Sequence, residues 1–207
     1  MISILSREWS AKSSIALPEK FRRTRSGSND IMTGWRSHGS GFDYEGKLAS
    51  LGKNVVIEDG VRIFFPEKVH IGSDVYIGHN SILKGYFDQT LKIGEGTWIG
   101  PQCFIYAAGG IDIGENVGIG PGVTIMSSGH QVLDSPEPIL HMPLQFARVV
   151  LGDGCDIGAN SVILMGVTIG SGVQIGAGAV VTRNIPAGAV AAGVPARILK
   201  TYHEFQA

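Results

Sequence analysis

Histidines are the side chains of this chain best suited to moving protons near neutral pH, because the imidazole pKa lies close to neutrality. The chain has six of them: His38, His70, His79, His130, His141 and His203. His130 and His141 differ from the rest because both belong to an irregular segment, 126–148, that interrupts a regular repeat. Surface positions are expected for His70 and His79. These positions suit a general base at His130 and a contact with a bound substrate at His141.

Composition excludes several classes of protein. The 207 residues carry 17 Lys and Arg against 18 Asp and Glu, a net charge of -1, which gives no bulk attraction to nucleic acid or to an anionic membrane. No apolar run approaches the roughly 18 residues that span a bilayer, and the N-terminus lacks a signal-peptide layout. The simplest interpretation is a soluble cytoplasmic protein. Cys103 and Cys155 are too few for a disulfide framework and are expected to be unpaired core thiols.

An aliphatic residue recurs every six residues through most of the chain, and the hexads fall into six groups of three. The groups begin at 51, 71, 93, 113, 151 and 169. Of the 18 repeat positions, 14 are Ile, three are Leu and one is Val181. Glycine follows in the first and second hexads of each group, with Glu58 as the exception, and never in the third. The groups are therefore true units of 18 residues.

This period predicts a triangular coil in which each hexad supplies one short strand and one corner. β-branched Ile at the inward positions favours strands, and a period of six does not fit a helix. The residue four positions further on is small or β-branched and is expected near a tight corner. Glycine, Asn and Asp are expected where a corner needs unusual backbone dihedrals. Stacked coils bury each other's inward side chains, so no coil is stable alone.

The repeat is absent or broken in three places. Residues 1–50 lack it and are expected to form an N-terminal arm or a cap over the first coil. Between Ile125 and Leu151 about twenty residues are surplus, which predicts a protruding loop at 131–148. The tail, 187–207, is expected to leave the solenoid and end in a short helix. The domain proper is then 51–186.

Three further motifs carry a family resemblance. These are Gly-Val-Thr-Ile-Met-Ser-Ser-Gly-His at 122–130, Gly-Ala-Gly-Ala-Val-Val-Thr-Arg-Asn-Ile-Pro at 176–186, and Gly-Val-Pro-Ala-Arg at 193–197. With the repeat, they make the chain resemble the hexapeptide-repeat acyltransferases, most closely the sugar and polysaccharide O-acetyltransferases of the galactoside and maltose type. The resemblance implies an all-β left-handed parallel β-helix of about six coils. It also implies a homotrimer with active sites between subunits.

The resemblance implies the following chemistry. An acetyl group passes from acetyl-CoA to a hydroxyl of a sugar or of a polysaccharide or lipopolysaccharide precursor by direct attack. His130 matches the family's catalytic histidine and acts as general base. No metal is expected. The residues that match the coenzyme site of the family are Ala159 and Ala177 beside the pantetheine arm and Thr182, Arg183, Arg197 and Lys200 near the nucleotide.

Two departures from the family pattern affect the acceptor. Asp156 stands where sugar acetyltransferases commonly carry Trp, and Gly100 stands where the galactoside type has an acceptor-positioning Asn. Gln102 is the nearest polar residue to Gly100. Asp134 and His141 in the loop are further candidates for acceptor contacts. The group that orients His130 is left open between a carboxylate and a main-chain carbonyl.

Other functions share this scaffold. A serine, amino-sugar or antibiotic acetyltransferase is the nearest alternative, although residues 1–50 are too short for the helical domain of the serine type. A γ-type carbonic anhydrase needs three zinc-binding histidines, and His130 lacks the close neighbour that this site requires. A purely structural solenoid explains the repeat but leaves the loop, His130 and the coenzyme-type residues unexplained.

Overall fold

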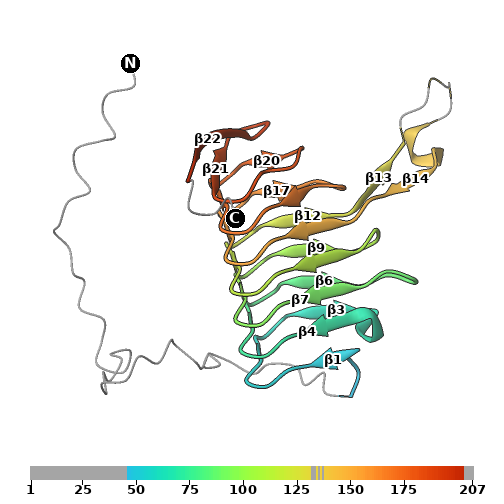
Figure 1. The fold of residues 1–207 in the computed structure, drawn as a ribbon. Coiled ribbons are helices and arrows are strands. Elements are labelled where there is room, and N and C mark those ends of the chain that lie inside the picture. The colour runs from blue at the N-terminus through green and yellow to red at the C-terminus, as the bar shows by residue number, and fades with distance from the viewer. Residues whose placement is uncertain (1–45, 132–133, 135, 137, 203–207) are drawn as a thin grey trace. The chain divides into compact units, whose positions relative to one another are not determined.

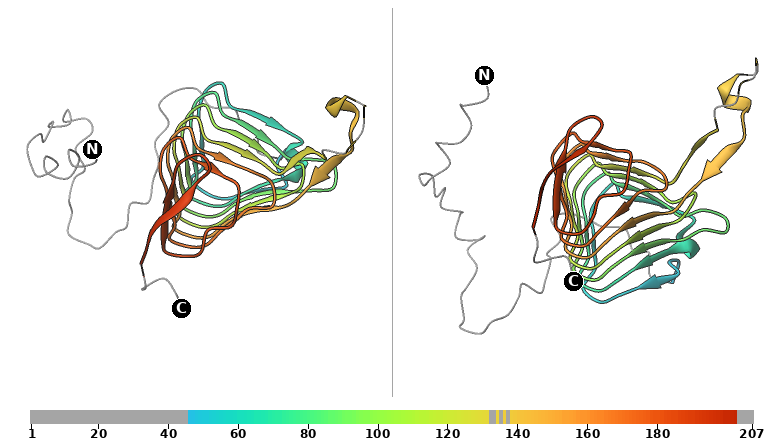
Figure 2. Two further views of the ribbon diagram at one scale, coloured as in Figure 1. Left: turned by 90° about the horizontal axis from the view of Figure 1, so that it is seen from above. Right: turned by 45° about the horizontal axis from the view of Figure 1, so that its top comes forward.

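The computed structural model describes residues 46–131, 134, 136 and 138–202, which form a parallel β-solenoid with three flat sheets. Viewed along its axis, the solenoid has a triangular cross-section (Figure 2). We call its sheets A, B and C in the order in which the chain visits them. The fold is a left-handed parallel β-helix, as expected, an exception to the usual right-handed crossover. The predicted arm at 1–50 lies, up to residue 45, outside the described residues.

Each sheet collects one hexad from every coil. Sheet A contains β1(Ser50–Leu51), β4(Val69–Ile71), β7(Leu91–Ile93), β10(Ile111–Ile113), β15(Val149–Leu151) and β18(Thr168–Ile169). Sheet B contains β2(Val56–Ile57), β5(Tyr76–Ile77), β8(Trp98–Ile99), β11(Gly118–Ile119), β16(Asp156–Ile157), β19(Gln174–Ile175), β21(Ala189–Ala192) and β22(Arg197–Thr201). Sheet C contains β3(Arg62–Phe64), β6(Ile82–Lys84), β9(Phe104–Tyr106), β12(Thr124–Met126), β17(Val162–Ile163) and β20(Val180–Val181).

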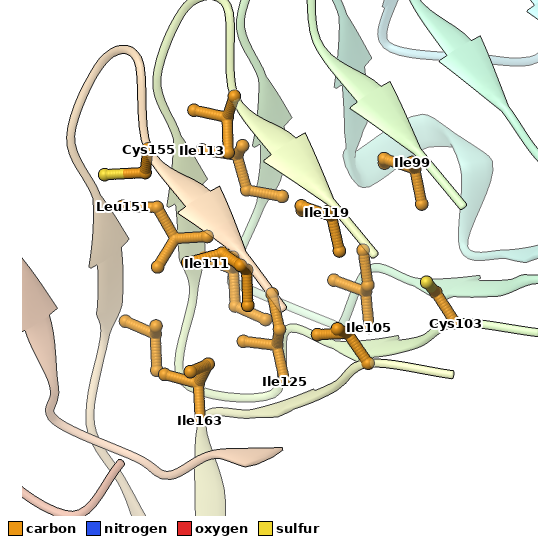
Figure 3. Close-up of a cluster of buried hydrophobic side chains, with 14 of the residues drawn as sticks. Ile99, Cys103, Ile105, Ile111, Ile113, Ile119, Ile125, Leu151, Cys155 and Ile163 are labelled. Atoms are coloured by element: carbon orange, nitrogen blue, oxygen red, sulfur yellow. The ribbon is translucent and has the colours of Figure 1, made fainter. Parts of the chain in front are cut away.

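The parallel register places every repeat residue on its counterpart in the next coil. Ile57, Ile77, Ile99 and Ile119 are successive partners in sheet B, and the other sheets follow the same rule. Figure 3 shows part of this core, in which Ile99, Ile119 and Ile125 point into the interior of the solenoid. Sixteen of the 18 repeat positions are buried; the other two are Leu51 and Ile63, both in the first described coil. The predicted period therefore defines the hydrophobic core.

Glycine has two different roles in the coils. The glycine after the aliphatic residue has an ordinary backbone conformation but allows close approach: a Cβ atom at Gly94 would lie 2.3 Å from the oxygen of Gly114 in the next coil. Other positions have positive φ, such as Gly154 at +65° and Asn116 at 54°. The prediction that glycine serves unusual dihedrals was thus correct only for this second set, because successive coils leave no room for a side chain at the first.

The C-terminal tail corrects the prediction of a terminal helix. β21 continues sheet B as part of a seventh coil, with Val190 beside Gln174, and β22 turns back antiparallel to it. Ala189 and Ala191 are buried, and that two-residue period is the pattern of a strand. Between β21 and β22 the Val194–Pro195 peptide is cis. The tail therefore extends the solenoid rather than leaving it.

The irregular segment forms a hairpin that begins three residues before the predicted loop. β13(Ser128–His130) pairs antiparallel with β14(Leu144–Phe146), and η3(Ile139–His141) lies between them. The hairpin projects from the edge between sheets C and A, which we call the C–A edge (Figure 1). No helix among residues 46–131 and 138–202 is long and apolar enough to cross a membrane.

Candidate active site

His130 is the last residue of β13 and faces Leu144 across the hairpin. Its Nδ1 atom lies 3.1 Å from the main-chain oxygen of Met142. Because a carbonyl oxygen can only accept, Nδ1 donates its proton there, and Nε2 keeps a lone pair. The imidazole is half-buried, and Met142 beneath it is buried. The side chain therefore has the tautomer that a base needs, with the orienting group supplied by the main chain.

The root of the hairpin is fixed by hydrogen bonds that the sequence did not reveal. The buried Ser127 hydroxyl accepts from the Gly109 N–H (2.8 Å) and donates to the Tyr106 oxygen (3.0 Å). The Ala147 N–H donates to the Ser127 oxygen (3.0 Å). Ser127 thus joins both strands of the hairpin to the coil below. The Ser-Ser-Gly-His run is visible in the sequence, but the hydroxyl partners of its first serine are 18 and 21 positions away.

Arg148 lies where the chain returns from the hairpin to the solenoid, between β14 and β15. Its guanidinium donates to Asp112 Oδ2 (2.7 Å) and to Gln89 Oε1 (3.2 Å), two residues of earlier coils. The Arg148–Asp112 pair is partly exposed, so it contributes only about 1 kcal/mol or less to stability. A Cβ atom at Gly110 would lie 2.7 Å from the guanidinium carbon, so glycine makes room for this contact. The hairpin therefore leaves the solenoid at a defined angle.

The predicted coenzyme residues lie in two groups. Ala159 and Ala177 follow β16 and β19 at the edge between sheets B and C, the B–C edge, one coil apart. Arg197 and Lys200 belong to β22, which adjoins the same sheet B. Lys200 Nζ lies 4.2 Å from the centroid of the Tyr202 ring, and Arg197 Nη1 donates to the Ala196 oxygen at 3.0 Å.

The second group lies on the other side of sheet C. Thr182 and Arg183 follow β20 at the C–A edge and are exposed. They lie at the same edge as the hairpin of His130, two coils further along the solenoid. Met165 lies in the coil between them, with its sulfur 3.6 Å from the position that a Cβ atom would take at Gly129. Five residues of chain separate Ala159 from the C–A edge, about 16 Å at strand spacing. One copy therefore does not bring Ala159 and Ala177 beside His130.

The predicted acceptor residues are also dispersed. Gln102 lies at the B–C edge with φ 59°, a left-handed conformation that is unusual for a residue other than Gly, Asn or Asp. Asp156 is exposed on sheet B and accepts from Gln174 Nε2 (3.2 Å). Asp134 is exposed, and His141 is an exposed residue of η3 in the hairpin. Only Asp134 and His141 share an element with His130.

A set of aromatic side chains was missed in the sequence. Tyr86 lies 6.2 Å from Phe146 of the hairpin, 5.8 Å from Tyr106 and 4.7 Å from Phe87, between ring centroids. Phe87 in turn lies 5.2 Å from Phe65. All five come from the C–A edge, where the surplus residues between repeat groups accumulate. Among the described residues, no group of three His, Cys, Asp or Glu side chains is arranged to hold a metal ion.

Comparison with known proteins agrees with this architecture. The family model for the hexapeptide repeat of succinyl-transferase matches residues 90–127 and 148–183. Galactoside O-acetyltransferase of Escherichia coli (strain K12) is 31% identical over 157 residues, which cover 76% of this chain and 66% of that protein. Nodulation protein L of Rhizobium meliloti (strain 1021) is 43% identical over 109 residues, 52% of this chain and 58% of that protein. The chain thus spans about two thirds or less of the length of these relatives.

A solved structure extends the comparison. A variant of AntD, an N-acyltransferase from Bacillus cereus in complex with dTDP and coenzyme A, superposes with a TM-score of 0.71 at 25% identity. The match covers 80% of this chain and 93% of that one. Fold, repeat and relatives together define a parallel β-helix enzyme class. The chain belongs to the hexapeptide-repeat acyltransferase family.

Proposed function

We propose that this protein transfers an acetyl group from acetyl-CoA to a hydroxyl of a sugar or of a polysaccharide precursor, with His130 as general base. The hydrogen bond from His130 Nδ1 to the Met142 oxygen is the observation that carries the proposal. It leaves Nε2 able to accept the hydroxyl proton, which a weakly acidic alcohol must lose as its oxygen attacks. The galactoside O-acetyltransferase relative supports a sugar acceptor.

The balanced reaction assigns each proton. The acceptor oxygen forms an ester bond to the acetyl carbonyl carbon while the carbon–sulfur bond breaks. The hydroxyl proton passes to Nε2 of His130 and then to the leaving sulfur. Base catalysis of this kind contributes roughly 10²–10⁴-fold to the rate. A donor in the cytoplasmic acetyl-CoA pool implies a cytoplasmic reaction.

The two groups of coenzyme residues support an active site between subunits of a homotrimer. Ala159 and Ala177 lie on the B–C edge, whereas His130 lies on the hairpin that leaves the solenoid at the C–A edge, across the width of sheet C. A second copy that sets its B–C edge beside the C–A edge of the first would bring both groups to one coenzyme. The small alanine side chains fit the passage of a pantetheine arm, and Arg183 and Arg197 suit its phosphates.

The structural neighbour supports a second candidate, N-acylation of an amino sugar carried on a nucleotide. AntD superposes over 93% of its length and was solved with dTDP and coenzyme A. Another variant of AntD was solved with dTDP-4-amino-4,6-dideoxyglucose and coenzyme A. A neutral amine is already nucleophilic and needs less help from a base. The oriented His130 therefore favours the hydroxyl acceptor.

One assay separates these candidates. Release of free thiol from acetyl-CoA is measured over a panel of sugars, oligosaccharides, nucleotide sugars, amino sugars and serine, and products are treated with alkaline hydroxylamine. Hydroxylamine cleaves an O-acetyl ester and leaves an N-acetyl amide intact. A labile product on a sugar, lost in His130→Ala, is expected. A stable product formed only on amino sugars would replace the first candidate by the second.

A further inference from the structure

The structure points to a binding surface for the acceptor that reaches well beyond His130. We infer that the aromatic ridge, defined as Phe65, Tyr86, Phe87, Tyr106 and Phe146, binds an extended saccharide chain and presents it to His130. Acetylation of the bound saccharide rests on the proposed function, whereas its binding to the ridge does not. It names the acceptor class as an oligosaccharide or polysaccharide rather than a free monosaccharide.

The aromatic ridge is continuous with His130. In the hairpin Ser128 pairs with Phe146 and His130 pairs with Leu144, so His130 and Phe146 are diagonal neighbours on one face of the two-stranded sheet. Such neighbours lie about 7–8 Å apart. Phe146 contacts Tyr86 at 6.2 Å, and the ridge continues from there to Phe87 and Phe65. A ligand lying along the ridge therefore ends beside the proposed base.

The length of the ridge indicates what it binds. Its rings come from four successive coils at the C–A edge: Phe65 follows β3, Tyr86 and Phe87 follow β6, Tyr106 ends β9, and Phe146 ends β14 of the hairpin that follows β12. Three steps of coil spacing give about 14 Å, enough for about three pyranose rings in a row. Figure 1 shows these turns above one another on the side of the hairpin. A single sugar would leave most of the ridge unused.

The chemistry of the ridge suits a saccharide. Aromatic faces carry negative charge density and attract the polarised C–H groups of a pyranose face. In the single chain Phe87 and Phe146 are 62% and 49% exposed. Polar groups stand beside them: Lys84 Nζ lies 4.7 Å from the Tyr106 centroid, and Gln89 and Arg148 lie at the same edge. Apolar faces next to amide and charged donors match a chain with C–H faces and hydroxyl edges.

Backbone strain at Phe65 is an independent observation. Phe65 has φ 53° and ψ 56°, a left-handed conformation that costs roughly 1–2 kcal/mol for a residue with a side chain. Among the described non-glycine residues with positive φ, only Phe65 and Gln102 are neither Asn nor Asp. Contacts with Tyr86 and Phe87 hold the Phe65 ring in this position. Strain of this kind is typical of positions that serve a function.

The test compares acceptor lengths. Malto-, cello- and chito-oligosaccharides of one to six units are titrated into the full-length protein by calorimetry, and the same series is assayed for thiol release. Phe87→Ala removes the most exposed ring of the ridge, and Trp98→Leu removes a half-buried ring from sheet B as the control. For the wild type, affinity is expected to increase up to about three or four units. Phe87→Ala is expected to lower the affinity for the longest acceptor by roughly three- to tenfold, and Trp98→Leu to leave it unchanged.

The outcomes separate the two proposals. Length-dependent binding that Phe87→Ala weakens supports the ridge even where no sugar is acetylated, a result that would overturn only the proposed reaction. Equal affinity for all lengths, absence of binding in all three series, or equal affinity of Phe87→Ala and wild type for the hexasaccharides would overturn the ridge as an acceptor surface. A change in oligomer mass in Phe87→Ala, measured by light scattering, would also overturn it, because the ridge would then be a subunit contact.

Discussion

The imidazole of His130 and the main-chain oxygen of Met142 are joined by a 3.1 Å hydrogen bond across the hairpin, at the end of its strands that lies away from the solenoid. Met142 lies in the segment just before β14. The next residue, Pro143, is held across the hairpin because its oxygen accepts from the Gln131 N–H at 2.9 Å. Side-chain substitution cannot remove such a carbonyl. The orientation of His130 therefore depends on the hairpin as a folded unit rather than on a second acidic residue.

Substitution of His130 should separate catalysis from binding. His130→Ala is expected to lower kcat at least about 100-fold, because it removes the Nε2 atom that is proposed to accept the hydroxyl proton. Coenzyme A affinity should stay within about twofold, since the phosphate contacts proposed for Arg183 and Arg197 are untouched. Thiol release and calorimetry measure the two quantities. His70→Ala, which removes a histidine of β4 outside the hairpin, is the control and should keep most of kcat; full turnover in His130→Ala would remove the assignment.

The coenzyme path should be sensitive to bulk at one point of the B–C edge. Ala177→Trp is expected to abolish detectable coenzyme A binding, because the exposed Ala177 position would lie against the pantetheine arm. Pro101→Trp is the matched control: Pro101 follows Gly100 as Ala177 follows Gly176, three coils earlier at the same edge. Calorimetry with coenzyme A compares the variants. Unchanged affinity in Ala177→Trp would show that the arm runs elsewhere.

The sequence predicted the coils well because one interaction repeats. Ile57, Ile77 and Ile99 stack at a period set by the fold, so the printed residues carry the architecture directly. The tail was mispredicted because Ala189 to Ala192 pair with β19 only through tertiary contact, which a local pattern does not contain. The Ser127 hydroxyl bonds to residues 18 and 21 positions away, and Tyr86 meets Phe146 of the distant hairpin, so the sequence pattern does not show which residues these side chains contact.

The extra residues between the repeat groups indicate which edge of the solenoid carries added structure. Two, four and two extra residues follow Ile63, Leu83 and Ile105, and each short insertion lies at the C–A edge, as does the long hairpin. Phe65, Tyr86 and Phe87 belong to these insertions. Counting the residues between repeat groups therefore predicts which edge carries added structure, and it could have directed attention to the aromatic ridge.

Close packing of the coils predicts an asymmetric response at two glycines. A Cβ atom at Gly158 would lie 2.4 Å from the Ala177 nitrogen, so Gly158→Ala should lower the free energy of unfolding by about 1–3 kcal/mol. Gly154 has φ +65° with nothing within 4 Å of its Cβ position, and Asn116 occupies a similar conformation one coil away. Gly154→Asn should stay within about 0.5 kcal/mol of wild type. Urea denaturation measures both; equal destabilisation would contradict the two glycine roles.

The two cysteines yield a prediction about pH. Burial raises the pKa of the Cys103 thiol to about 11 and also raises the pKa of Cys155. Both thiols are unpaired, and Cys103 Sγ donates to the Gly120 oxygen at 3.2 Å. At pH 8 the folded protein should therefore react with Ellman's reagent far more slowly than the protein in urea. Fast reaction of both thiols without denaturant would contradict this burial.

The shifted pKa of Cys103 also sets the sign of an effect on stability. Between the ordinary thiol pKa of 9.0 and about 11, the folded state keeps the proton that the unfolded state loses. The unfolded state then binds fewer protons, so the free energy of unfolding should fall as pH rises through this window. Cys103→Ser is a suitable test, because Ser81 and Ser161 occupy the same position in other coils and donate to the oxygens of Gly100 and Gly176. The serine variant should fold and show a smaller loss of stability between pH 9 and 11 than wild type, measured by urea denaturation; an identical pH profile would show that Cys103 does not titrate differently in the two states.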